Sequence, residues 1–252
     1  MSENIVVLGA KGLLGSHLCQ LYPVIGLDKS QCDITKRSDL FTMLLTHRPT
    51  TIINCSGITP KGGKNFYQVN AYGPKLLETL CEPFGTRIIH VSTNCVFSGV
   101  RGNRTEAHFP DPKDDYGMSK YLGEITRRPH LTIRTSFVGL PDPNGRGLLA
   151  WAEGQENIRG YRHYSWNGLT TVELAKQIME FYVPSKVSGL VHLFAETISK
   201  FELLTTAQEV FGWDKIITPV DKPEVWHTLD TIYVPTITKS FATMLREMRE
   251  AL

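Results

Sequence analysis

A short apolar run followed at once by evenly spaced glycines constrains the fold of this chain most strongly. Residues 4–8 read as a buried strand, Gly9, Gly12 and Gly15 follow it, and residues 16–21 have a helix-forming composition. A dinucleotide-binding turn needs this order, because glycines let the backbone approach a pyrophosphate at the positive end of the helix. A glycine-rich loop without a ligand is the alternative. We predict a cofactor-binding turn that contains Gly9, Lys11, Gly12, Leu13, Leu14 and Gly15.

An acidic residue stands where the adenosine ribose of such a dinucleotide would lie. Residues 24–28 read as a second strand that ends in Asp28, nineteen residues after Gly9. An acid about twenty residues beyond the glycine turn accepts hydrogen bonds from the ribose hydroxyls. We therefore predict that Asp28 binds the ribose and that Lys29, Asp33 and Ile34 lie close to the adenosine.

Strands and helices alternate over the first half of the chain. Apolar runs at 51–54, 88–91 and 131–139 read as strands buried on both faces of a parallel sheet, and residues 35–47 and 65–81 read as helices. This alternation predicts an α/β fold with a Rossmann-type doubly wound parallel sheet. Ligands of such sheets collect at the carboxyl ends of the strands. The small residues that follow the third strand there are Cys55, Ser56 and Gly57.

Tyr116 and Lys120 are four residues apart in a predicted helix, so their side chains share one face. A cation at about 4 Å, with an effective dielectric constant of roughly 20, is worth ~4 kcal/mol and would lower the pKa of the phenol by about three. Tyr116 would then serve as a general acid near neutral pH. The pair alone is weak evidence, because nine tyrosines make this spacing common by chance.

After Gly139 the sequence no longer shows a clear alternation of strands and helices. We predict an NAD(P)-binding domain at 1–139 and a smaller substrate-binding lobe at 140–252, with an approximate boundary and with C-terminal segments that can return to the sheet. Residues 159–168 combine arginines with aromatic rings, which pair with phosphates and stack on sugars or bases. An ordinary surface loop is the alternative. The candidate substrate contacts in this segment are Arg159, Arg162 and Trp166.

Composition narrows the class of protein further. The net charge of +2 argues against a nucleic-acid-binding or polybasic membrane surface. No apolar run approaches the roughly 18 residues that a membrane span needs, and a strand candidate at residue 4 leaves no room for a leader peptide. Five cysteines without a C-x-x-C pair read as reduced thiols. We expect a cytoplasmic protein without a metal site.

Taken together, these motifs resemble the extended short-chain dehydrogenase/reductase superfamily and, within it, the dTDP-4-dehydrorhamnose reductases and related sugar-nucleotide reductases. The G-x-x-G-x-x-G and Y-x-x-x-K spacings are the superfamily's own. The match in the second lobe, around residues 166–171, is less specific. The other segments that carry the resemblance are Asp28, 32–34, 54–57, 69–71, 92–99, 116–124 and 134–138.

The resemblance implies NAD(P)H-dependent reduction of the 4-keto group of a dTDP- or UDP-linked 6-deoxyhexose, in activated-sugar biosynthesis. Tyr116 would donate a proton to the carbonyl oxygen, Lys120 would tune Tyr116 and hold the nicotinamide ribose, and Thr93 would hydrogen-bond the same oxygen. We expect NADH and NADPH both to be used, because Lys11 and Lys29 offset the repulsion of a 2′-phosphate by Asp28. Asn70 and Ser92 join the cofactor contacts, and the sugar contacts are Thr93, Asn94, Cys95, Val96 and Phe137.

Two positions depart from the family pattern and leave the hexose and the product stereochemistry open. Asn94 stands where the family often has Asp, and Phe137 where it often has Trp. A sugar-nucleotide epimerase or dehydratase on the same fold is one alternative, although Asn94 and Cys95 do not supply the acidic pair of a dehydratase. The other is a non-catalytic subunit, since the regulatory subunit of methionine adenosyltransferase also resembles these reductases. A homodimer is left open as well.

Overall fold

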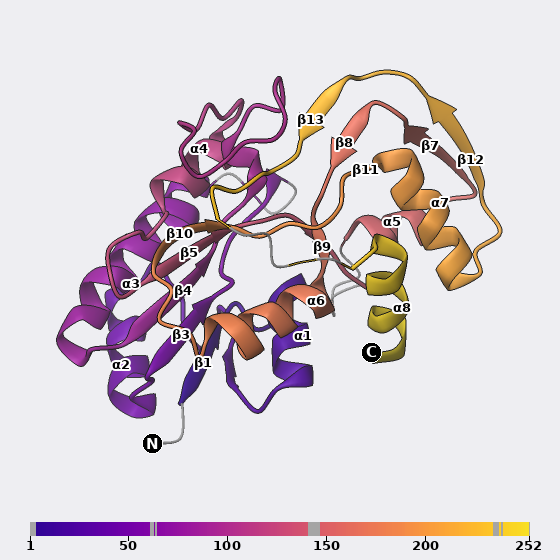
Figure 1. The fold of residues 1–252 in the computed structure, drawn as a ribbon. Helices are drawn as coiled ribbons and strands as arrows, with labels where there is room; N and C mark the ends of the chain where they lie inside the picture. Colours follow the sequence, from indigo (N-terminus) through magenta and orange to yellow (C-terminus); the bar gives the residue numbers. More distant parts are fainter. Residues whose placement is uncertain are drawn as a thin grey trace.

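A parallel sheet forms the centre of the molecule in the computed structural model, which describes residues 4–60, 63, 65–140, 147–233, 237 and 239–251. Each strand of this sheet is parallel to its neighbours, so all carboxyl ends lie at one edge (Figure 1). In order across the sheet, the six strands are β10 (Gly189–His192), β5 (Leu131–Arg134), β4 (Arg87–Val91), β3 (Thr51–Asn54), β1 (Ile5–Leu8) and β2 (Ile25–Leu27).

Helices cover both faces of the sheet. On one face lie α1 (Leu13–Leu21) and α6 (Thr171–Lys176), and on the other lie α2 (Arg37–His47) and α3 (Gly73–Cys81) (Figure 1). Successive strand residues point to opposite faces, so a sheet covered on both sides needs apolar residues throughout its strands. The doubly wound α/β fold that the alternation predicts is confirmed.

The second lobe combines three helices with short strand pairs. β11 (Ile198–Ser199), β8 (Tyr164–Trp166) and β13 (Val225–His227) form a three-stranded sheet. Two pairs complete the strands, β12 (Ile216–Val220) with β7 (Asn157–Tyr161) and β6 (Phe137–Val138) with β9 (Leu169–Thr170). Its helices are α5 (Leu148–Glu153), α7 (Lys200–Phe211) and α8 (Phe241–Ala251), and the π-helix η5 (Gln177–Tyr182) continues α6.

Two sequence expectations differ from the structure. The strand expected at 131–139 is broken, because the Ser136 carbonyl accepts the Leu169 N–H at 2.9 Å and draws the chain away from the large sheet. β5 therefore ends at Arg134, and β6 pairs with β9. The segment 159–168, for which a surface loop was the alternative, contributes residues to β7 and β8 instead.

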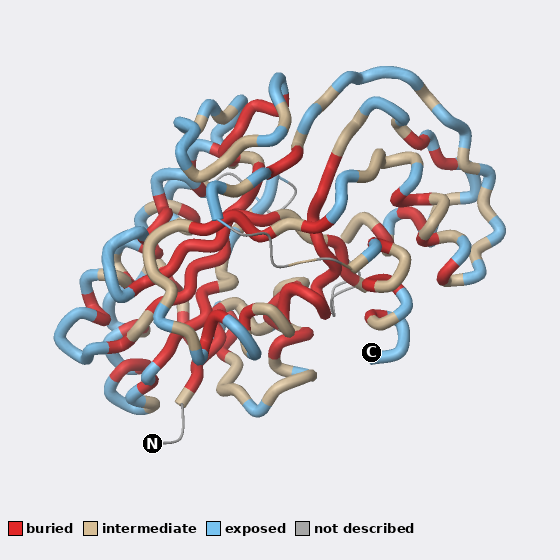
Figure 2. The backbone as a smooth tube through the Cα atoms, in the orientation of Figure 1, coloured by how far each residue is buried: buried red, intermediate tan, exposed pale blue. Residues whose placement is uncertain are grey.

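The chain also crosses back from the second lobe. β10 joins the large sheet beside β5, so the sheet takes one strand from beyond residue 140, and the boundary at 139/140 stays a prediction. Figure 2 shows the contrast in burial between the large sheet, whose strands are buried, and the outer arch that carries β12 and β13, which is largely exposed. Within the described ranges, no helix combines the length and apolar composition that a bilayer crossing needs.

Candidate active site

The glycine turn after β1 forms a backbone cradle at the start of α1. Gly9 has a φ of +82°, and a Cβ on it would lie 2.9 Å from the backbone nitrogen of Ser56. Its carbonyl accepts the Gly12 N–H at 2.9 Å, and α1 begins at Leu13 without a side chain that caps its first N–H groups. Free N–H donors at a helix N-terminus favour a phosphate. The turn therefore fits the pyrophosphate of a dinucleotide.

Asp28, directly after β2, is surrounded by donors. The Lys11 ammonium forms an ion pair with the carboxylate, and the backbone N–H and hydroxyl of Ser30 donate to Oδ1 at 2.7 and 2.6 Å. The hydrogen bonds from Lys11 and Ser30 hold the pKa of Asp28 well below its usual range. Asp28 is thus ionised, and Lys11 offsets its charge at the mouth of the glycine turn. Lys29 is exposed beside it.

The two residues expected next to the adenosine have structural contacts of their own. Asp33 Oδ1 accepts hydrogen bonds from the backbone N–H and hydroxyl of Thr35, at 3.0 and 2.7 Å. Ile34 is buried in the core that α2 and α3 share, where it packs against Gly73. Asp33 therefore stabilises a turn and Ile34 fills the core, and their contact with an adenosine stays a prediction.

Asn70 ties the loop after β3 to the helix that carries Tyr116. It is fully buried in a π-helix, η2 (Tyr67–Tyr72). Its side chain accepts the Ile58 N–H at 2.9 Å and donates to the Ile58 carbonyl and to Ser119 Oγ, at 3.0 and 3.1 Å. These bonds hold the loop of Cys55, Ser56 and Gly57 in place. Asn70 is thus a positioning residue for that loop.

The end of β4 presents polar side chains at the same edge of the sheet. Ser92 Oγ donates to Glu124 Oε1 at 2.9 Å. Thr93 Oγ1 accepts the Cys95 N–H at 3.1 Å and so caps the short 3₁₀ turn η4 (Asn94–Val96). Asn94 Nδ2 donates to the His227 carbonyl at 3.0 Å, which joins β4 to the second lobe. The candidate Val96 is fully buried in a small core with Phe97 and Leu229.

Tyr116 and Lys120 lie on α4 (Asp115–Leu122), as the sequence predicts. The helix starts after Asp114, whose Oδ1 accepts the Gly117 N–H at 2.8 Å. The Lys120 ammonium donates to the Val91 carbonyl at 2.8 Å. The Thr93 side chain is close enough to Tyr116 to lower the pKa of its phenol. The two α4 side chains therefore lie close to Val91 and Thr93, at the end of β4 and just beyond it.

The pKa of Tyr116 moves in the direction opposite to the one expected from sequence. Burial raises it, the neighbouring Cys95 and Asp114 raise it further, and only the Thr93 side chain lowers it. Lys120 is itself buried, and burial lowers its own pKa to about 8. Desolvation is thus the largest effect on both groups, and Lys120 is not among the residues that shift the pKa of Tyr116. A phenol with a raised pKa stays protonated at neutral pH, which is the state that a proton donor requires.

The loop after β3 reaches Lys120 from the cofactor side. A Cβ on Gly57 would lie 3.8 Å from Lys120 Nζ and 3.3 Å from Asn70 Oδ1. Burial raises the pKa of the Cys55 thiol to about 12, so this cysteine is unreactive. Gly57 therefore brings the backbone of this loop close to Lys120, on the side where a nicotinamide and its ribose are predicted to lie.

A buried ion pair lies at the carboxyl end of β5, next to the candidate site. Arg134 donates from Nε and Nη2 to the two carboxylate oxygens of Glu124, each at 2.7 Å. The side chains are only 3% and 5% exposed, and Ser92 donates to the same carboxylate. A bidentate pair of this kind fixes relative orientation as well as distance. It connects β5, the end of α4 and the residue before Thr93.

The second lobe places side chains opposite Cys95 that the sequence reading missed. Lys200, the first residue of α7, lies with Nζ 4.6 Å from the centroid of the Trp166 ring and 5.5 Å from that of Tyr164. Lys200 interacts electrostatically with Cys95 and His227. The ring of His227 lies 5.7 Å from Tyr164. The signal available in the sequence was S-x-x-E at 199–202, a capping box that places Lys200 in the first turn of a helix.

The two arginines that the sequence suggested as substrate contacts lie on exposed parts of the second lobe. Arg162 pairs with Asp221 on the exposed side of the second lobe, with Nη2 to Oδ1 at 2.7 Å and with both side chains more than half exposed. Arg159 is exposed on β7. Trp166 is buried, and its Nε1 donates to Ser136 Oγ at 2.8 Å next to the partly buried Phe137. Trp166 therefore supports Lys200 and connects the lobe to β6.

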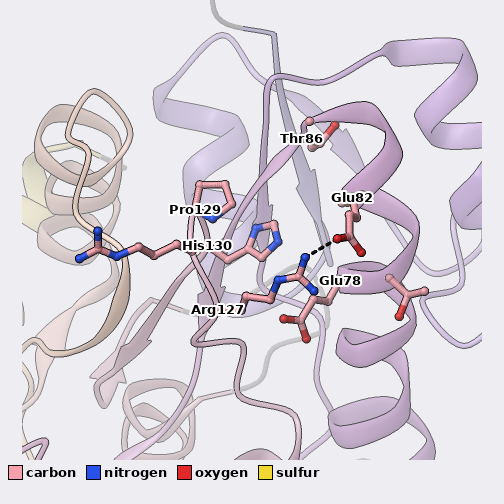
Figure 3. A pocket seen from close by; sticks show the side chains of 10 residues that line it. Glu78, Glu82, Thr86, Arg127, Pro129 and His130 are labelled. Atoms are coloured by element: carbon pink, nitrogen blue, oxygen red, sulfur yellow. Dashed lines mark hydrogen bonds and ion pairs between the residues drawn. The ribbon is translucent and has the colours of Figure 1, made fainter.

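Two cavities lie away from Thr93, Tyr116 and Lys120. One of about 280 Å³ opens at the amino ends of β4 and β5, the edge of the sheet opposite to the glycine turn. Figure 3 shows Arg127 paired with Glu82 across it, with His130 close by. The other, of about 440 Å³, lies beside the edge strand β10 and is lined by Phe181 among others. Thr93, Tyr116 and Lys120 line neither cavity.

Comparison with known proteins agrees with this geometry. The family model described as RmlD substrate binding domain matches residues 3–150, more than half of the chain. The chain belongs to this family. The dTDP-4-keto-6-deoxy-D-glucose reductase of Streptomyces niveus is 29% identical over 219 residues, which cover 76% of this chain and 73% of the relative. The spore coat polysaccharide biosynthesis protein SpsK of Bacillus subtilis is 27% identical over 88% of this chain and 84% of its own length.

Solved structures share the fold. The dTDP-4-dehydrorhamnose reductase of Bacillus anthracis, solved in complex with NADP, superposes with a TM-score of 0.86 at 21% identity and covers all of both chains. The dTDP-4-dehydrorhamnose reductase from Clostridium acetobutylicum gives 0.85 at 22% identity over 98% of each chain. The resemblance to sugar-nucleotide reductases inferred from the motifs is confirmed. The roles of the individual site residues stay predictions.

Proposed function

We propose that this protein is an NAD(P)H-dependent reductase of the 4-keto group of a nucleotide-linked 6-deoxyhexose. The observation that carries the proposal is the convergence of three groups at the end of β4. The Thr93 side chain is close enough to Tyr116 to lower the pKa of its phenol, and Lys120 is anchored at 2.8 Å to the carbonyl of Val91, two residues before Thr93. The names of the curated relatives, reductases of dTDP-linked keto sugars, point to the same reaction.

The reduction of a ketone needs a hydride on carbon and a proton on oxygen. A nicotinamide cofactor, when bound, supplies the hydride. Tyr116 donates its phenolic proton to the carbonyl oxygen, and the Thr93 hydroxyl hydrogen-bonds the same oxygen and stabilises the charge that develops on it. The Lys120 ammonium stabilises the phenolate left on Tyr116 until solvent returns the proton. The raised pKa of Tyr116 keeps the donor protonated before the reaction.

We further propose that both NADH and NADPH are used. An ionised Asp28 accepts from the two ribose hydroxyls of NADH and repels a 2′-phosphate. The ammonium of Lys11 forms an ion pair with that carboxylate, and it is the group that can turn to a 2′-phosphate. Because these charges oppose each other, kcat/KM with NADH and kcat/KM with NADPH should differ by less than about a hundredfold, which corresponds to roughly 2.7 kcal/mol.

The test is turnover by the purified full chain. NADH or NADPH is mixed with a panel of dTDP- and UDP-linked 4-keto-6-deoxyhexoses, and cofactor oxidation is followed together with the sugar product. We expect one equivalent of cofactor to be oxidised for each keto sugar reduced. Interconversion of two sugars without net cofactor oxidation would instead indicate an epimerase. An absence of both reactions, in a protein that binds NADPH, would indicate the non-catalytic alternative.

A further inference from the structure

A fully buried histidine precedes Val91, whose carbonyl binds Lys120. This residue, His90 on β4, lies with its Nδ1 3.0 Å from Asn54 Nδ2 on the neighbouring strand β3. Asn54 Oδ1 accepts the Ser56 N–H at 3.1 Å, so the amide nitrogen is the group that faces the imidazole. An amide nitrogen donates and does not accept, so His90 Nδ1 is an acceptor and the proton of the neutral ring lies on Nε2.

The other ring nitrogen of His90 is a buried donor without an acceptor. In the part of the chain that the structure describes, Nε2 has no hydrogen-bond partner. Burial lowers the pKa of His90 well below its usual range, and the charges of Lys120 and Lys75 lower it further, so the ring stays neutral. An unpaired buried donor destabilises a fold, and an apolar side chain of similar size would avoid this effect. Departures of this kind are expected at functional sites.

The contact between His90 and Asn54 is unsuited to proton transfer. An amide does not release its protons near neutral pH, so a proton that arrived at Nε2 could not leave the ring through Nδ1 toward Asn54. His90 therefore does not return protons to Tyr116 after the reduction. What the contact does is geometric, because an acceptor at Nδ1 fixes which end of the Asn54 amide faces the ring.

The orientation of the Asn54 amide holds the loop after β3. The Ser56 nitrogen that Asn54 Oδ1 binds is the atom that a Cβ on Gly9 would approach to 2.9 Å. A Cβ on Gly57, the next residue, would lie 3.8 Å from Lys120 Nζ. The loop is therefore close both to the glycine turn and to Lys120. A rotated Asn54 amide would place Nδ2 against the Ser56 N–H, and two donors repel each other.

We propose that His90 is a positioning residue for the nicotinamide half of the dinucleotide, an inference that rests on the proposed function. Its Nδ1 fixes the amide of Asn54, and that amide holds the loop 55–57 next to Lys120. Because His90 is fully buried, it acts through Asn54 and not by contact with a ligand. Asp28, the predicted contact of the adenosine ribose, is outside these hydrogen bonds. The effect of His90 is therefore confined to the nicotinamide half.

Ligand binding without turnover tests this assignment. Calorimetry with NADPH, and with 2′,5′-ADP as the adenosine half alone, is performed on the full chain and on His90→Leu, His90→Asn, Asn54→Ala and the double variant of His90→Leu with Asn54→Ala. Leucine accepts no hydrogen bond, whereas the asparagine oxygen can take the place of Nδ1. The control is Thr132→Val, because Thr132 is buried opposite His90 on β5 and binds Ile125 instead of the loop. Urea titrations give the free energy of unfolding of each variant.

We expect His90→Leu to weaken NADPH binding ~5- to 100-fold, the range for a lost hydrogen bond whose buried partner is left unpaired, and to leave 2′,5′-ADP binding unchanged. Its free energy of unfolding should stay close to that of the parent chain, because the variant loses one unpaired donor, Nε2, and gains another, Asn54 Nδ2. His90→Asn should recover most of the NADPH affinity, and Thr132→Val should keep all of it.

The double variant shows whether His90 acts through Asn54. It should bind NADPH as well as Asn54→Ala alone, since His90 then has no amide to orient. Additive losses, an equal loss of NADPH and 2′,5′-ADP affinity in His90→Leu, or unchanged NADPH affinity in that variant would overturn the assignment. These results come from binding alone, so they are separate from the turnover assay that decides whether the chain reduces keto sugars.

Discussion

The Lys120 ammonium donates a 2.8 Å hydrogen bond to the carbonyl of Val91, the last residue of β4. This contact joins the helix that carries Tyr116 to the strand that leads into Thr93. It also takes Lys120 out of water, and burial lowers its pKa to about 8. The protonation state of Lys120 therefore changes within the pH range of ordinary assays, whereas Tyr116 stays protonated through it.

We expect the alkaline limb of the kcat–pH profile to belong to Lys120. The ammonium is present below its pKa, so kcat should fall as pH rises through about 8. Lys120→Arg should lower kcat overall but move this limb above pH ~10, because a guanidinium stays charged. If the alkaline limb of Lys120→Arg still has its midpoint near pH 8, the limb belongs to another group.

The buried pair of Glu124 and Arg134 should contribute strongly to stability. Glu124→Gln leaves the Arg134 guanidinium, which is 3% exposed, without its carboxylate. The free energy of unfolding should fall by about 3–5 kcal/mol in urea titrations, because a buried charge is left uncompensated. The matched control is Glu82→Gln, which breaks the exposed pair with Arg127 and should change stability by less than about 1 kcal/mol. Equal effects of the two variants would contradict a structural role for the buried pair.

The charges of Asp28 and Lys11 should set cofactor preference in opposite directions. Asp28→Ala removes the carboxylate that repels a 2′-phosphate and should shift the kcat/KM ratio toward NADPH. Lys11→Met removes the cation that pairs with Asp28 and should shift the ratio toward NADH. The ratio is measured with one keto sugar at saturation. If neither variant changes it, these residues do not contact the ribose.

Much of the first lobe was predictable, because its signals are local. The glycines after β1 and the four-residue spacing of Tyr116 and Lys120 follow from the geometry of one turn or one helix. The pKa of Tyr116 was not predictable in the same way, since the burial that raises it comes from tertiary packing. A local spacing says which groups are neighbours and not how much water surrounds them.

The second lobe was harder to read for a related reason. β12 pairs with β7 across more than fifty residues of sequence, and Thr218 and Pro219 interrupt its apolar residues, so the sequence does not mark it as a strand. Lys200, at the start of α7, interacts electrostatically with Cys95. The carbonyl of His227, on β13, accepts a hydrogen bond from Asn94. Only the folded chain brings these segments together. Arg162 was selected for the composition of its segment, but it already forms an ion pair with Asp221, which directly follows β12, the partner strand of β7.

Tyr116→Phe turnover tests the central claim most directly. The variant removes one hydroxyl and keeps the ring that packs edge-on against Phe66 at 6.3 Å. The control Tyr121→Phe changes a tyrosine that is 37% exposed on the same helix. With NADPH and a 4-keto-6-deoxyhexose nucleotide, kcat of Tyr116→Phe should fall about 10²–10⁴-fold, the usual contribution of general acid catalysis. The affinity of Tyr116→Phe for NADPH and the kcat of Tyr121→Phe should remain unchanged. Full turnover by Tyr116→Phe would contradict the assignment of Tyr116 as the proton donor.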